Sequence, residues 1–121
     1  MEHVSRVIRK EDAELRTADG VEVVVAISKE TVGSPTLWFG SFATEPGVKV
    51  PPHYHTADTG AYVVSGRAAF EIDGERHEVI AGEYLYVPKG VVHTEETVGN
   101  ETAFGIFARD EAGGETVYLE Q

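Results

Sequence analysis

The chain has 121 residues, a length suited to one domain that buries its own core. It contains no cysteine, which excludes disulfides, thiolate metal sites and cysteine nucleophiles. Its formal net charge of −11 would repel a polyanion, so we expect no nucleic-acid partner.

Hydropathy gives no sign of a membrane partner. The longest uninterrupted apolar run, from Val23 to Ile27, is far shorter than the roughly 20 residues that cross a bilayer. The N-terminal sequence has no apolar stretch long enough for a signal peptide. We therefore expect a cytoplasmic protein, with a single domain over residues 1–121.

The order of elements predicts an all-β protein. Residues 1–16 are interpreted as a peripheral segment, and only they have a weak helical character. Short β-branched and aromatic runs follow, separated by glycine, proline and other turn residues. They predict strands over residues 21–27, 36–44, 48–55, 61–65, 67–72, 75–79, 84–87, 103–108 and 116–119. Short strands at this spacing indicate an antiparallel sandwich or barrel.

Asp73-Gly74 is the clearest local signal. Two such residues between strand-like runs favour a type I′ hairpin turn, in which both positions have positive φ. The turn predicts a register in which Ile72 faces Glu75, Glu71 faces Arg76 and Phe70 faces His77. The Glu71–Arg76 pair places opposite charges across the ladder on a solvated face, and His77 is interpreted as a structural or surface residue.

The faces of two aromatic pairs stay open at this point. Tyr84 and Tyr86 share one side of their strand, and alternation alone does not decide whether that side is buried. Trp38 and Phe42 also share one side, which fits a barrel interior and a dimer seam equally well.

Three histidines are the candidate metal ligands. His53 and His55 lie two residues apart in a predicted strand, so they project to the same side and can converge on one ion. The alternative for an isolated pair is a surface or core-satisfied role. His93 follows a Pro88-Lys89-Gly90 turn and supplies a third imidazole.

The stretch from Gly47 to Thr97 resembles the two motifs of the cupin family. The first, G-x5-HxH-x3,4-E-x6-G, is matched by Gly47, His53, His55 and Gly66, with Thr59 in place of glutamate. The second, G-x5-P-x-G-x2-H-x3-N, is matched by Gly82, Pro88, Gly90 and His93, with Thr97 in place of asparagine. The resemblance implies an antiparallel jelly-roll barrel (a double-stranded β-helix), a metal inside its mouth and a homodimer.

The resemblance implies one divalent ion, which the imidazole donors allow to be Fe, Mn, Ni or Zn. Counting alternate faces from His55, Thr59 points inward and Asp58 outward. A threonine hydroxyl is a poor ligand for a divalent cation, so a three-histidine site is expected. A small backbone irregularity would instead let Asp58 supply a carboxylate.

Glu95 is the candidate catalytic residue. If residues 93–97 stay extended, Glu95 shares the inward side with His93 and Thr97. The resemblance implies an apolar aromatic there, so a carboxylate could act as a general base or bond to a metal-bound water. The alternative, which charge-rich segments favour, is a solvated loop.

Three functions remain open. Three-histidine cupins include thiol and diketone dioxygenases, so the resemblance favours a metal-dependent dioxygenase acting on a small organic molecule. An isomerase or lyase on a sugar or carboxylate substrate is the first alternative. A non-catalytic protein that binds a small ligand is the second.

Overall fold

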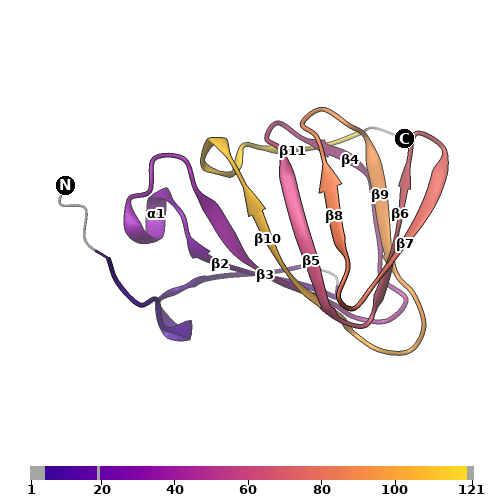
Figure 1. Cartoon of the computed structure of the whole chain (residues 1–121), viewed down its shortest axis with the longest axis horizontal. Coiled ribbons are helices and arrows are strands. Elements are labelled where there is room, and N and C mark those ends of the chain that lie inside the picture. Colours follow the sequence, from indigo (N-terminus) through magenta and orange to yellow (C-terminus); the bar gives the residue numbers. More distant parts are fainter. Residues whose placement is uncertain (1–4, 19, 120–121) are drawn as a thin grey trace.

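The structure, a computed structural model, describes residues 5–18 and 20–119. Its strands form two sheets in which neighbouring strands are antiparallel, as Figure 1 shows. The first sheet contains, in spatial order, β1 (Glu14–Ala18), β2 (Val21–Ile27), β3 (Trp38–Thr44), β10 (Ala103–Arg109), β5 (Thr59–Ser65) and β8 (Tyr84–Val87). The second contains β11 (Thr116–Tyr118), β4 (Lys49–His55), β9 (His93–Thr97), β6 (Arg67–Ile72) and β7 (Glu75–Ile80). This arrangement confirms the predicted all-β jelly roll.

The interior has two apolar clusters, with a pocket between them. Strands β5, β6 and β7 supply the first cluster, which contains Val63, Ala68, Phe70 and Val79. Strands β2, β3 and β10 supply the second, which contains Val25, Trp38 and Phe107. Residues from both clusters line the pocket, so the hydrophobic core leaves a cavity in which side chains of both sheets meet.

The predicted hairpin is confirmed in detail. Asp73 and Gly74 have φ values of 52° and 78°, as a type I′ turn requires. Ile72 pairs with Glu75, Glu71 with Arg76 and Phe70 with His77. The His77 side chain is 48% exposed, so it is a surface residue.

The N-terminal prediction is wrong in part, because residues 14–18 form β1 rather than a weak helix. This strand pairs along its whole length with β2 at the edge of the first sheet. Before it, Lys10–Asp12 form one short 3-10 turn, and residues 1–4 lie outside the described residues. The polar sequence ELRTA does not show the apolar alternation by which a strand is predicted, because an edge strand does not need it.

Helical turns also occur elsewhere, although only the N-terminus was expected to be helical. The helix α1 (Lys29–Val32) begins after Ser28, whose hydroxyl accepts a hydrogen bond from the Thr31 N–H. It ends at Gly33, which is left-handed. A 3-10 turn covers Glu111–Gly113. In the described part of the chain, every helix is too short to cross a bilayer.

The aromatic pairs are now assigned to their sides. Trp38 is 8% exposed and packs on Phe107 inside the barrel, with ring centroids 4.9 Å apart. Tyr84 and Tyr86 point outward and are 78% and 63% exposed. Trp38 therefore belongs to the barrel interior rather than to a seam between copies.

Candidate metal centre

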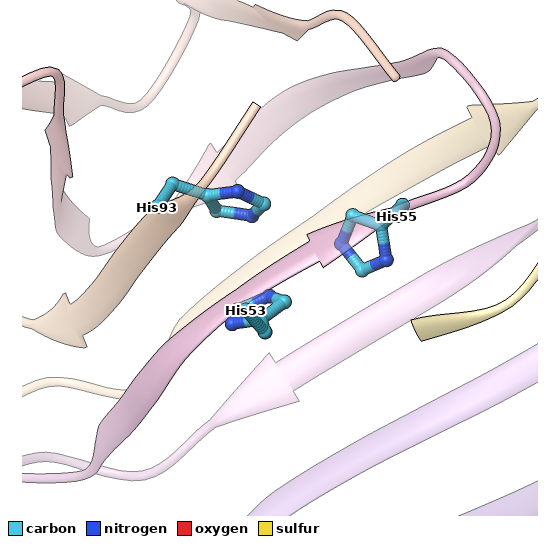
Figure 2. A group of neighbouring side chains, drawn as sticks. All are labelled: His53, His55 and His93. Atoms are coloured by element: carbon cyan, nitrogen blue, oxygen red, sulfur yellow. The ribbon is translucent and has the colours of Figure 1, made fainter. Parts of the chain in front are cut away.

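Two neighbouring strands of the second sheet bring the three histidines together. His53 and His55 lie on β4, and His93 lies at the start of β9, directly opposite His53. Figure 2 shows the three rings turned toward a common space between the strands. One ring nitrogen of each histidine lies within 4.8 Å of the others. The alternation of side chains thus placed His53 and His55 on one side, as predicted, and His93, which was predicted from the second motif, joins them.

Hydrogen bonds at Nδ1 fix which nitrogen of each ring faces the shared space. His53 Nδ1 donates to the Pro51 carbonyl at 2.8 Å, and His93 Nδ1 donates to the Val91 carbonyl at 3.0 Å. Because a carbonyl can only accept, a neutral ring in this arrangement keeps its Nε2 lone pair free. Metal-binding histidines commonly make this bond through the nitrogen that does not bind the ion.

The third ring has a side-chain partner. His55 Nδ1 lies 3.0 Å from the Thr116 hydroxyl, which is on β11. That contact occupies Nδ1 and leaves His55 Nε2 as the ring's second nitrogen, which lies 3.3 Å from a terminal nitrogen of Arg109. The donor set therefore fits a divalent ion that accepts three imidazole nitrogens.

All three imidazoles are held neutral. Their exposed fractions are 2% for His53, 7% for His55 and 4% for His93. Burial lowers each pKa, because a charged imidazolium loses its hydration there. For His55, burial and the positive charge of Arg109 together lower the pKa to about 3. Neutral imidazole is the form that binds metal.

Thr59 faces the pocket, as expected, but it contacts a residue that the sequence reading did not select. Its hydroxyl accepts a 3.0 Å hydrogen bond from Nε of Arg109, its neighbour across β5 and β10. An Arg109 terminal nitrogen lies 3.3 Å from Nε2 of His55. A guanidinium therefore lies beside the histidines, next to the place where the motif would put a carboxylate.

Arg109 could have been found from the alternation of β10. In the sequence AFGIFAR, Phe107 and Arg109 share a side with Gly105, and that side is the buried one. A charged residue at the end of a strand is normally expected to be solvated. For this reason Arg109 was not selected from the sequence. Burial lowers the pKa of Arg109 to about 10, while Glu95 raises it, so the side chain stays charged at neutral pH.

Asp58 lies outside the group of histidines. Its carboxylate accepts a hydrogen bond from the backbone N–H of Lys89 at 2.9 Å. Its own N–H donates to the Asp110 carboxylate. The carboxylate is thus used to hold two loops together, and Asp58 does not line the pocket.

Glu95 lies inside the barrel, within the strand β9. The alternative interpretation of its segment, a solvated loop, is wrong, because β9 pairs on both sides, with β4 and with β6. A carboxylate oxygen of Glu95 lies 3.8 Å from Nε2 of His53. The side chain is 30% exposed, and it lines the pocket. Burial raises its pKa, and the nearby Arg109 opposes this rise.

The histidines, Glu95 and Arg109 share one pocket of about 400 Å³. Its remaining wall is mainly apolar and aromatic and includes Trp38, Phe42 and Phe107. The space is sufficient for a small organic molecule beside the histidines. The arrangement thus combines three neutral nitrogen donors, one carboxylate and one guanidinium in a largely apolar cavity.

Comparisons with known proteins agree with this architecture. The chain is 29% identical over 103 residues to the polyketide synthase CurC of Streptomyces cyaneus, a match that covers 84% of this chain and 67% of CurC. It is 29% identical over 82 residues to the tetracenomycin polyketide synthase protein TcmJ of Streptomyces glaucescens, covering 67% of this chain and 55% of TcmJ. The matches thus span about half to two thirds of these relatives.

Solved structures share the fold at low sequence identity. The polyketide cyclase RemF from Streptomyces resistomycificus matches with a TM-score of 0.81 and 18% identity, over 98% of this chain and 87% of RemF. Oxalate decarboxylase from Bacillus subtilis matches with a TM-score of 0.82 and 22% identity, over 98% of this chain and 33% of that chain. Residues 40–107 match the family described as "Cupin domain". The chain therefore belongs to the cupin family.

Proposed function

We propose that His53, His55 and His93 hold one divalent metal ion, with Fe, Mn, Ni and Zn as the candidates. The observation that carries this proposal is the convergence of three buried imidazoles, each with one ring nitrogen within 4.8 Å of the others and each with its Nδ1 hydrogen-bonded. The Nε2 lone pair of His55 accepts from an Arg109 terminal nitrogen at 3.3 Å, and an ion bound by His55 through Nε2 would replace that contact. The Glu95 carboxylate, 3.8 Å from Nε2 of His53, would add a negative charge beside the ion.

We further propose that the protein is a metal-dependent enzyme that acts on a polyketide-like carbonyl compound. The names of CurC, TcmJ and RemF support this class of substrate. The apolar and aromatic wall of the pocket suits the carbon skeleton of such a molecule. A divalent ion held by the histidines would polarise a carbonyl oxygen of the substrate.

In this proposal Glu95 is the general base. Its carboxylate lines the pocket next to the histidines, so it can reach a C–H group adjacent to a carbonyl bound there. Glu95 takes the proton, and the released electron pair forms a bond to a second carbonyl carbon of the same molecule. Glu95 then returns the proton to the oxygen of that second carbonyl. The product is a ring, and no external oxidant is required.

Proton abstraction can be measured without knowing the natural substrate. The zinc-loaded protein in D₂O should speed hydrogen–deuterium exchange at the methyl group of an aryl methyl ketone, followed by NMR. Glu95→Gln should slow the protein-catalysed exchange about 10²- to 10⁴-fold, the usual worth of a general base. Glu96→Gln is the matched control, because Glu96 is the next residue, does not line the pocket and pairs with Arg76 and Lys49.

The outcome that contradicts this role is equal exchange by the two variants. Circular dichroism should show both folded, because neither change removes an apolar contact. A loss of exchange in both variants would place the effect in the fold rather than in the carboxylate.

A dioxygenase is the second candidate, and one observation favours it. The group of converging ligand atoms consists of three nitrogens without a carboxylate, as the sequence predicted for the three-histidine subgroup. Oxygen uptake by the iron-loaded protein with a 1,3-diketone measures this activity. Uptake without proton exchange at the ketone would favour the dioxygenase over the cyclising enzyme. No feature of the described pocket specifically favours an isomerase, a lyase or a non-catalytic ligand-binding protein.

We also propose a homodimer, formed through the outer side of the first sheet. Apolar and aromatic side chains gather there on β3, β5, β8 and β10 around a shallow groove; Tyr84, Tyr86 and Ile106 are exposed, and Phe39 and Tyr62 are half-buried. The residues that line this groove include no Asp, Glu, Lys or Arg, so two copies of a chain with net charge −11 can meet there with little repulsion. Analytical ultracentrifugation measures this assembly. The cytoplasmic location stays a prediction.

A further inference from the structure

The lining of the pocket has the opposite charge balance to the rest of the chain. The whole sequence has 21 Asp and Glu residues against 10 Lys and Arg residues. The pocket is nevertheless lined by three cations, Arg16, Lys49 and Arg109, and by a single carboxylate, Glu95. Cationic side chains therefore outnumber carboxylates around this cavity, against the balance of the chain as a whole.

Two of the three cations already have carboxylate partners. Arg16 pairs with Glu14, and Lys49 lies 3.7 Å from Glu96. Within residues 5–18 and 20–119, Arg109 forms no ion pair. Its guanidinium is therefore the cation of the pocket whose charge a ligand can still neutralise.

The surroundings of Arg109 leave donors available. Of its five N–H groups, one is used by Thr59, and a terminal nitrogen is directed at His55. The other charged or ionisable groups around it are Glu95, Arg16, Tyr118 and the remaining histidines. A guanidinium can bind a carboxylate through two parallel hydrogen bonds, which adds both strength and orientation.

We propose that Arg109 binds the carboxylate group of an otherwise apolar, aromatic substrate and so positions that substrate beside the three histidines. The aromatic and aliphatic wall of the pocket receives the body of the molecule. This assignment rests on the proposed function, because it takes the pocket to be the substrate site.

Thr59 and Trp38 hold the guanidinium in place. The Thr59 hydroxyl anchors Nε, and the Trp38 ring lies under the guanidinium at 4.7 Å from its centroid. Thr59 thus has a role that a glutamate ligand at that position would change. A carboxylate there would neutralise Arg109, and the site would lose its preference for an anion.

Trp38 makes this inference measurable, because it is the chain's one tryptophan and contacts Arg109. Benzoate is the probe, and benzamide is its neutral counterpart of the same shape. Each is titrated into the metal-free and the zinc-loaded protein while Trp38 fluorescence is recorded, and calorimetry gives an independent dissociation constant. Benzoate should bind at least tenfold more tightly than benzamide, since hydrogen bonds to charged groups are worth more than neutral ones.

Variants identify the residue responsible. Arg109→Met should weaken benzoate binding at least tenfold and leave benzamide binding unchanged. Arg109→Lys should be intermediate, because it keeps the charge and loses the fork of donors. Thr59→Val should weaken benzoate less than Arg109→Met does. Arg67→Met is the matched control, since Arg67 is an exposed arginine of β6 outside the pocket and its loss changes the net charge equally.

Two results would overturn the inference. One is equal affinity of the wild type for benzoate and benzamide, including no binding of either up to the solubility limit. The other is benzoate binding by folded Arg109→Met at wild-type strength. Zinc binding is measured separately, so the two proposals can fail independently: a protein that binds benzoate through Arg109 but no metal contradicts the metal centre alone.

Discussion

At position 59 a threonine hydroxyl faces the histidines where the cupin motif has a carboxylate. The structure gives this substitution a partner, because the hydroxyl holds Nε of Arg109 at 3.0 Å. A negative ligand has thus been replaced by a polar residue that positions a cation. The positive charge of Arg109 is also one cause of the lowered pKa of each of the three histidines.

This arrangement predicts how metal affinity responds to changes at Thr59. Thr59→Val should retain the ion, because a hydroxyl contributes little to a divalent cation compared with imidazole. Thr59→Glu should tighten binding on the order of tenfold or more, because it adds a negative charge beside the ion and offsets Arg109. Competition with a chromogenic chelator measures both. Loss of metal in Thr59→Val would show that the hydroxyl itself coordinates the ion.

At the scale of single elements, the features that depend only on local backbone geometry were predicted from the sequence. The Asp73-Gly74 turn fixes the register of β6 and β7 through its own backbone angles. The alternation of β4 was enough to direct His53 and His55 to one side. Neither result requires knowledge of the rest of the chain.

The missed elements depend on partners that are distant in the sequence. The strand β1 is polar and exists through its pairing with β2. The segment that contains Glu95 is charged and is extended because β4 and β6 flank it. Arg109 acquires its role from Thr59, which is 50 residues away. Composition cannot reveal such pairings.

The element β10 makes a prediction about stability. Gly105 faces inward, and a Cβ added there would lie 2.4 Å from the Tyr62 carbonyl and 2.6 Å from the Phe42 ring. Gly105→Ala should therefore destabilise the fold by about 1–3 kcal/mol, the usual cost of overpacking. Urea unfolding measures this change.

Gly60→Ala is the matched control on the neighbouring strand β5. A Cβ there would meet nothing within 4 Å, so the change should be neutral or slightly stabilising. Equal stability of Gly105→Ala and the wild type would show that β10 and β5 can separate to admit a methyl group.

On the scale of the whole molecule, the buried histidines link stability to pH in the metal-free protein. The lowered pKa values keep the rings neutral in the folded state, while the unfolded chain protonates them below its ordinary pKa of 6.5. The unfolded state then binds more protons, so stability falls as the pH falls below about 6.5. The raised pKa of Glu95 has the opposite effect on the pH dependence of stability. It is a single group, whereas three histidines contribute to the loss of stability at low pH.

Urea unfolding in the presence of a chelator, at a series of pH values between 7.5 and 5, measures this slope. Each histidine contributes up to about 1.4 kcal/mol per pH unit. His55→Asn should reduce the slope, whereas His77→Asn at the exposed position should not. A slope that is unchanged in His55→Asn would contradict the neutral, buried state of that ring.

The account as a whole depends on the convergence of three imidazoles on one ion. The most direct measurement is the metal content of the purified protein by elemental analysis, after loading with zinc and removal of free metal. Wild type and His77→Ala should each retain about one ion per chain, the latter because His77 lies on the surface. His55→Ala should lose most of it, since two imidazoles bind a divalent ion far more weakly than three. Equal metal content in His55→Ala and His77→Ala would contradict the proposed centre.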